Sequence, residues 1–198
     1  GKTIYRYSNK FGILDSSMSV VLPAQYDDIK SIQHDQLLAR KGNKVGIIDY
    51  KNNIIIPLVY DSLRVENYNV LVLRKTEGWF LTNRKQTFRS PKNYQQIENQ
   101  QAGIYPVKNN GYWGALNQWG AETIHCVFDS LLEISAKQVV VKFKDQYGII
   151  SIMEDWLVPP QPHPLILVND SCYLQLEPQN KFLKSIKGEV IYFTDNPF

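Results

Sequence analysis

The chain has 198 residues and a formal net charge of +3; 43% of the residues are hydrophobic and 21% are charged. This is the composition of an ordinary folded protein, and the charge is too small for the dense basic surface of a nucleic-acid binder, so we expect no nucleic-acid partner. No run of about 18 apolar residues occurs, so we expect no transmembrane helix. Cys126 and Cys172 are too few for a disulfide framework, and their spacing does not decide whether they pair.

The first predicted hairpin, at residues 5–15, contains a motif that returns every 34 residues. The copies read FGILD, VGIID, WFLTN, WGALN, YGIIS and KFLKS, and they align Gly12, Gly46, Phe80, Gly114, Gly148 and Phe182. Fourteen positions later the chain carries Tyr26, Tyr60, Tyr94 and Phe128, three of them followed by Asp27, Asp61 and Asp129. A register shared along the whole chain predicts a single repeat domain over residues 1–198.

The local pattern within each repeat predicts β-strands. In the second repeat, residues 36–41 (QLLARK), 45–49 (VGIID) and 53–57 (NIIIP) are short apolar runs separated by polar turns. A shorter fourth run follows each Tyr-Asp position. It carries Ile29, Leu63, Ile97, Leu131 and Leu165 at one repeat position. Each repeat is therefore predicted to be a meander of three strands and a shorter fourth, with no helix.

The predicted strands are apolar on both faces, which is typical of small sheets stacked on one another. In the run 36–41, Leu37 and Ala39 point to one face and Leu38 to the other. Six stacked units can form a propeller-like ring, which covers the ends, or an open β-superhelix with polar caps. We favour the propeller-like ring, because the first and last predicted hairpins are not strongly polar, and keep the open array as the alternative.

These residues resemble the bacterial WG (KWG) repeat family. The best match is Asn110-Gly111-Tyr112-Trp113-Gly114, and residues 37–63 carry most of the rest, with Val45 in place of Trp. Phe80 and Phe182 depart from the pattern by replacing glycine. The resemblance implies a β-repeat scaffold of bacterial, often envelope-associated proteins, and it implies no shared catalytic residue. We interpret Trp113-Gly114 as a structural position, where an aromatic packs and glycine permits close approach of the backbone.

A basic residue lies six positions before the aligned glycine in five of the six repeats. These residues are Arg6, Arg40, Arg74, Lys108 and Lys142. They predict either a basic rim for an anionic partner or structural ion pairs with the Asp of the Tyr-Asp turns, and we favour the ion pairs.

Trp119 and Trp156 are the other candidate ligand contacts. Trp119 follows the repeated hairpin at a predicted turn, where a tryptophan is usually exposed. Residues 159–164 (PPQPHP) are predicted to form a rigid exposed loop that interrupts strand pairing and offers a docking place, with a polyproline ligand as the alternative.

The sequence contains no arrangement of residues that indicates catalysis or metal binding. His34, His125 and His163 occupy different repeat positions, and the carboxylates are isolated rather than clustered as calcium ligands. We therefore expect no enzyme, no metal and no cofactor. The prediction is a non-catalytic scaffold that binds a protein partner, in the bacterial cell envelope or secreted rather than cytoplasmic. Carbohydrate binding through Trp119, Trp156 and exposed tyrosines is the alternative, and an anionic or glycan ligand fits either reading.

Overall fold

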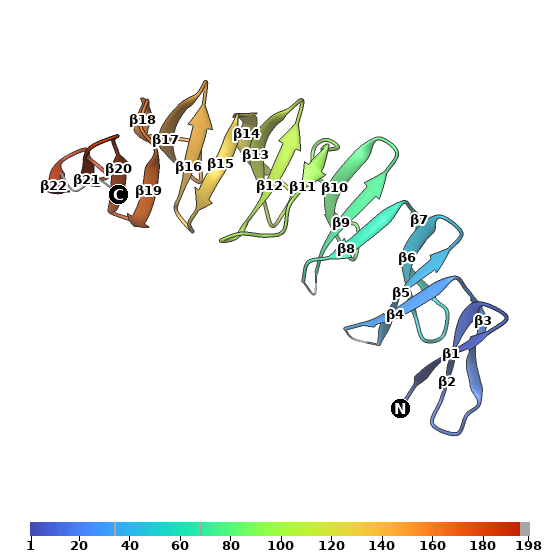
Figure 1. Ribbon diagram of the computed structural model, residues 1–198. Coiled ribbons are helices and arrows are strands. Elements are labelled where there is room, and N and C mark those ends of the chain that lie inside the picture. The colour runs from blue at the N-terminus through green and yellow to red at the C-terminus, as the bar shows by residue number, and fades with distance from the viewer. Residues whose placement is uncertain (34, 68, 195–198) are drawn as a thin grey trace. The chain divides into compact units, whose positions relative to one another are not determined.

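The computed structural model describes residues 1–33, 35–67 and 69–194, and over these residues the chain is built from antiparallel β-sheets (Figure 1). The described residues form 22 strands in six small sheets, each a propeller-like meander. None of the described segments is a helix that could span a membrane. The prediction of an all-β array of propeller-like repeats is confirmed.

The first compact unit, Gly1–Arg89, contains three of these sheets. Sheet A consists of β1 (Thr3–Tyr7), β2 (Lys10–Leu14) and β3 (Val20–Tyr26). Sheet B consists of β4 (Asp28–Ile32), β5 (Gln36–Lys41), β6 (Lys44–Asp49) and β7 (Ile54–Tyr60). Sheet C consists of β8 (Ser62–Val65), β9 (Val70–Lys75) and β10 (Gly78–Asn83).

The second compact unit, Ser90–Phe198, contains three four-stranded sheets. Sheet D consists of β11 (Gln96–Ile97), β12 (Ile104–Asn109), β13 (Tyr112–Asn117) and β14 (Glu122–Phe128). Sheet E consists of β15 (Ser130–Ile134), β16 (Gln138–Phe143), β17 (Gln146–Ser151) and β18 (Trp156–Gln161). Sheet F consists of β19 (Leu165–Asn169), β20 (Cys172–Leu176), β21 (Lys181–Ser185) and β22 (Val190–Thr194).

Each of the sheets B to F combines strands from two successive repeats. The short fourth run of one repeat becomes the first strand of the next sheet, as β4 pairs with β5 and β15 pairs with β16. The crossing is held by the residue after the repeated aromatic: the Asp27 amide donates to the Arg40 carbonyl at 2.8 Å, and the Asp129 amide to the Lys142 carbonyl at 2.8 Å. Successive repeats are therefore joined by backbone hydrogen bonds.

The core consists of apolar layers between neighbouring sheets of the same unit. In sheet B, Leu37, Ala39 and Ile48 pack toward sheet A, whereas Ile47 and Ile56 pack toward sheet C. Sheet E repeats the arrangement, since alternate residues of β16 pack toward sheets D and F. This alternation covers β5 and β16 on both faces, as the sequence predicted.

In sheets A, B, D and E the aligned glycine lies opposite a bulge in the last strand of its sheet. In sheet B, Val45 pairs with Tyr60 and Ile47 with Ile56, so residues 57–59 bulge opposite Gly46 alone. A Cβ on Gly46 would lie 2.5 Å from the Ile56 carbonyl oxygen and 2.8 Å from the Leu58 nitrogen. Only glycine leaves room for the bulged backbone at this distance.

The two repeats with phenylalanine at this position lack that bulge. Sheet C ends at β10, and the Arg89 guanidinium lies 4.1 Å from the Phe80 ring centroid. In sheet F, Phe182 pairs directly with Phe193, and their rings stack at 5.5 Å. The departures from the repeat sequence therefore coincide with departures from the repeat structure.

The predicted loop at residues 159–164 is wrong over residues 159–161. These residues end β18, where Val158 pairs with Ile149 and Gln161 with Tyr147. Pro159 and Pro160 occupy the bulge opposite Gly148, where no ladder amide is needed. The bulge accommodates the prolines, so pairing resumes after them.

Candidate binding site

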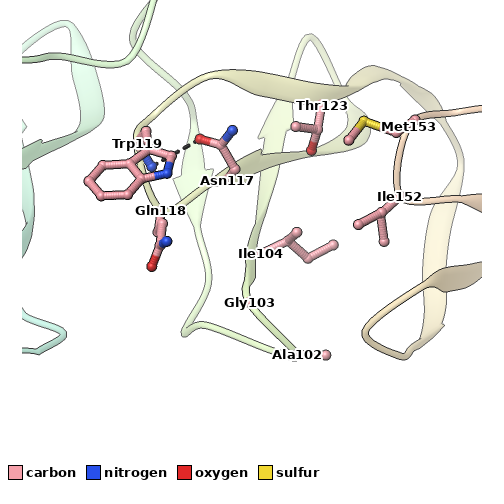
Figure 2. A pocket seen from close by; sticks show the side chains of 9 residues that line it. All are labelled: Ala102, Gly103, Ile104, Asn117, Gln118, Trp119, Thr123, Ile152 and Met153. Carbon is pink, nitrogen blue, oxygen red and sulfur yellow. Dashed lines mark hydrogen bonds between the residues drawn. The ribbon is translucent and has the colours of Figure 1, made fainter.

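One cavity of the second unit is a small, open pocket between sheets D and E (Figure 2), which we call the Trp119 pocket. Its volume is about 270 Å³. It is lined by Ala102, Gly103, Ile104, Asn117, Gln118, Trp119, Thr123, Ile152 and Met153. None of these side chains carries a charge, so the pocket suits an uncharged group.

A repeated turn holds Trp119 at one side of this pocket. The Asn117 side-chain oxygen accepts hydrogen bonds from the amides of Trp119 at 2.9 Å and Ala121 at 3.1 Å. Gly120 completes the turn with a φ of +76°, a left-handed conformation that favours glycine. Asp15, Asp49 and Ser151 form the same pair of bonds in their own repeats. The turn is therefore a structural part of the repeat.

The residue that this turn presents to solvent differs between repeats. Trp119 and Met153 occupy the same position in successive repeats and are 63% and 70% exposed. The other repeats carry small or basic residues there, namely Ser17, Lys51, Lys85 and Lys187. Sequence reasoning found Trp119 and missed Met153, although the 34-residue period aligns the two. Exposed apolar side chains at an otherwise polar position indicate a contact surface.

A buried hydroxyl adds a polar feature to the pocket. In Figure 2, Thr123 lies between Asn117 on one side and Met153 on the other. Among the described residues that line the pocket, Thr123 has a buried Oγ1 with no hydrogen-bond partner. A buried hydroxyl without a hydrogen-bond partner is costly to the fold.

Trp156 is placed apart from this pocket. Its ring covers Gly148 and packs against Phe128 and Phe143, with a centroid distance of 6.0 Å to each. This aromatic cluster connects β18 with β14 and β16, and Trp156 remains 42% exposed. The structure therefore does not bring together the two tryptophans predicted as ligand contacts.

The predicted basic residues face the aromatic position across their own hairpins. Arg74 is opposite Trp79, with the guanidinium 5.7 Å from the ring centroid, and Lys108 is opposite Trp113 at 5.4 Å. Arg6 lies 5.7 Å from the Phe11 ring in the same way. The cation and the aromatic of the WG pattern are thus a cross-strand cation–π pair.

The other two basic residues, Arg40 and Lys142, lie near carboxylates instead of forming such a cation–π pair. Where Val45 replaces the aromatic, Arg40 lies 3.7 Å from the Asp28 carboxylate. Lys142 lies 2.8 Å from Asp145. The role of these five cations as a rim for an anionic partner stays a prediction.

The Asp of the Tyr-Asp turn pairs with a different cation from the predicted one. Asp27 accepts from the Lys10 ammonium at 2.5 Å and from the Gly42 amide at 2.7 Å, and Asp61 accepts from Lys44 at 2.5 Å. Both hydrogen bonds lower the pKa of Asp27, and the bond from Lys10 has the larger effect. The favoured interpretation, which paired Asp27 and Asp61 with the basic residues six positions before the glycine, is wrong. The hairpin register places Lys10 beside Asp27 and Lys44 beside Asp61. Both lysines lie two positions before the aligned glycine.

Titratable side chains elsewhere in the second unit make structural pairs. His125 Nδ1 lies 2.5 Å from Glu154 Oε2, and this hydrogen bond raises the pKa of His125.

Cys126 and Cys172 are free thiols, and burial raises the pKa of Cys126 to about 11. Within residues 1–33, 35–67 and 69–194 no group of His, Cys, Asp and Glu could hold a metal ion. His34 lies outside the described residues.

A family model described as WG containing repeat matches residues 11–44 and 46–79. The predicted resemblance to WG repeats is confirmed over these two consecutive repeats. No curated protein matches the chain.

Solved structures resemble the chain only at low identity. A protein described as the eukaryotic initiation factor has 7% identity and a TM-score of 0.46, over 99% of this chain and 63% of its own. An Hsv2 variant with loop 6CD replaced by a Gly-Ser linker has 10% identity and a TM-score of 0.40, over 83% and 64%. The N-terminal domain of Nup159 has 10% identity and a TM-score of 0.36, over 87% and 61%. The chain spans less than two thirds of each, and we base no argument on these likenesses.

Proposed function

We propose that this protein is a non-catalytic scaffold that binds a protein partner, as part of a bacterial cell-envelope complex, and that it needs no cofactor. The observation that carries the proposal is the exposure of Trp119 and Met153 at a turn position that is polar in the other repeats. The envelope assignment rests on the resemblance to WG repeat proteins. Repeat arrays commonly bind through residues that vary over a constant framework.

The dimensions and chemistry of the Trp119 pocket suit one apolar side chain of the partner. About 270 Å³ is less than a typical small-molecule site, but it is sufficient for an anchor residue. Tryptophan and other large side chains at the centre of an interface carry much of the binding energy. A charged anchor would lose its hydration without gaining an opposite charge, so the partner's anchor is expected to be uncharged.

The test is affinity purification of the full chain from its source cells, followed by mass spectrometry, with three forms of the protein compared. The wild type should bring down a stoichiometric companion. Trp119→Ala should lose it, because removing a central tryptophan raises the Kd by about 30-fold or more. Tyr7→Ala is the matched control, since Tyr7 is an exposed aromatic at the end of β1 in the other unit.

The result that would contradict this proposal is a companion retained equally by the wild type and Trp119→Ala. Recovery of the wild type without any companion would also count against it. Both variants should unfold at the wild-type temperature within about 2 °C, because neither residue is buried.

Carbohydrate binding is the second candidate, and the exposed Trp119 indole beside a pocket without charged side chains favours it. A sugar ring could stack on the Trp119 indole. A glycan panel titrated against intrinsic tryptophan fluorescence tests this function. A response in the wild type that disappears in Trp119→Phe would support it, and an unchanged spectrum across the panel would exclude it.

A further inference from the structure

β22 (Val190–Thr194) differs from the strands that occupy the same edge in the other four-stranded sheets and in sheet A. β3, β7, β14 and β18 bulge opposite a glycine, and three of them also contain proline. β22 contains no proline, its residues 192–194 pair one to one with residues 181–183 of β21, and its register shifts once, at Ile191. Bulges and prolines keep edge strands from pairing with other chains, and β22 lacks both proline and the glycine-facing bulge.

The side chains of β22 also differ from those of a protected edge. Val190, Ile191, Tyr192 and Phe193 are each more than half exposed, and the strand has no charged residue. Phe193 stacks on Phe182 of the neighbouring strand β21. An uncharged, apolar edge without proline is suited to accept another strand.

We propose that β22 pairs antiparallel with β22 of a second copy of this chain, joining two copies of sheet F into one continuous sheet. Antiparallel pairing of identical strands is twofold symmetric, and a strand without charges does not repel its own copy. With the axis at Tyr192, this residue is opposite its own copy in the partner, and pairs of aromatic side chains opposite each other stabilise antiparallel sheets.

The size of this contact predicts a weak, reversible dimer. Four half-exposed apolar side chains offer on the order of 400 Å² from each copy. The total is on the order of 800 Å², below the 1,200–2,000 Å² of stable complexes, so we expect a Kd on the order of tens of micromolar.

Sedimentation velocity of the 198-residue chain from about 1 to about 500 μM tests the proposal. The wild type should shift from monomer to dimer over this range. Tyr192→Lys places two like charges opposite each other at the axis and should raise the Kd at least about tenfold. Val168→Lys is the matched control, because Val168 is exposed on β19, at the opposite edge of the same sheet. This variant should dimerise as the wild type does.

A charge exchange tests the register. Tyr192→Glu should also be monomeric alone, but an equimolar mixture with Tyr192→Lys should dimerise, since opposite charges then meet at the axis. The wild-type protein, studied without any variant, should show slower amide exchange in β22 at high than at low concentration. A wild type that stays monomeric at every concentration would overturn the proposal. The proposal would also be overturned if the wild type formed assemblies larger than a dimer and the mixture of Tyr192→Lys and Tyr192→Glu did not dimerise. Such assemblies indicate a head-to-tail contact.

Discussion

The role of the aligned glycine can be tested by Gly46→Ala. A Cβ there would lie 2.5 Å from the Ile56 oxygen, 2.8 Å from the Leu58 nitrogen and 2.8 Å from the Pro57 carbonyl carbon. All three atoms belong to backbone, so no side chain can rotate away to relieve the contact. β7 must move outward and lose hydrogen bonds to β6, at a cost of about 3 kcal/mol or more.

Two further glycines make this prediction quantitative. Gly42→Ala in the same hairpin is the control: its Cβ would meet nothing within 4 Å, and its φ of +60° costs about 1 kcal/mol. Gly148→Ala should fall between the two, because its Cβ would first meet the Trp156 ring, a side chain, and the Val158 oxygen only at 3.0 Å.

Thermal unfolding followed by circular dichroism measures the series. At about 2–4 °C per kcal/mol, Gly46→Ala should lower Tm by about 6–12 °C and Gly42→Ala by about 2–4 °C. Equal shifts for the two variants would refute the argument, because the bulge would then tolerate a side chain. Hydrogen exchange should place the loss of protection in β6 and β7.

Three further predictions concern titratable side chains. The pKa of His125 is raised by Glu154, so the pair stabilises the fold fully below pH ~6.5 and this stabilisation is lost as the pH rises through the folded-state pKa. NMR titration should therefore show Glu154→Gln lowering the His125 pKa, and an unchanged value would contradict the pairing. The pKa of Asp27 is lowered by Lys10, so its stabilisation is present above pH ~3.9 and is lost as the pH falls through the folded-state pKa. The difference in Tm between the wild type and Asp27→Asn should therefore be larger at pH 7 than below pH ~3. With a pKa of about 11, Cys126 is about 0.1% thiolate at pH ~8, so its alkylation should be about a hundredfold slower than that of an ordinary cysteine, and rapid labelling would show that it is not buried.

The sequence predicted the repeat and the strand pattern because both depend on local composition. The runs 36–41 and 45–49 became β5 and β6 with little change. The sharing of each fourth strand with the next sheet was not predicted, because a repeat period does not state which strands pair. The ion pairs of Asp27 and Asp61 were misassigned for the same reason, since the relevant distances depend on hairpin register.

The candidate site was predicted in part. Trp119 could be found because it follows a repeated hairpin at a turn. Met153 could have been found by aligning that turn across repeats, whereas the unpartnered Thr123 hydroxyl could not, since burial depends on the neighbouring sheet. The loop predicted at residues 159–164 was wrong over residues 159–161, because proline is excluded from a ladder but not from a bulge.

The sequence by itself determined the all-β class, the 34-residue repeat and the need for glycine beside the aromatic. These follow from side-chain patterning, which acts within a few residues of the chain. Only the tertiary structure decided that the glycine faces a bulge, that the basic residue lies across its hairpin from the aromatic position, and that Trp119 and Met153 border one pocket. Each of these depends on which backbone segments lie side by side, and that is set by packing between sheets.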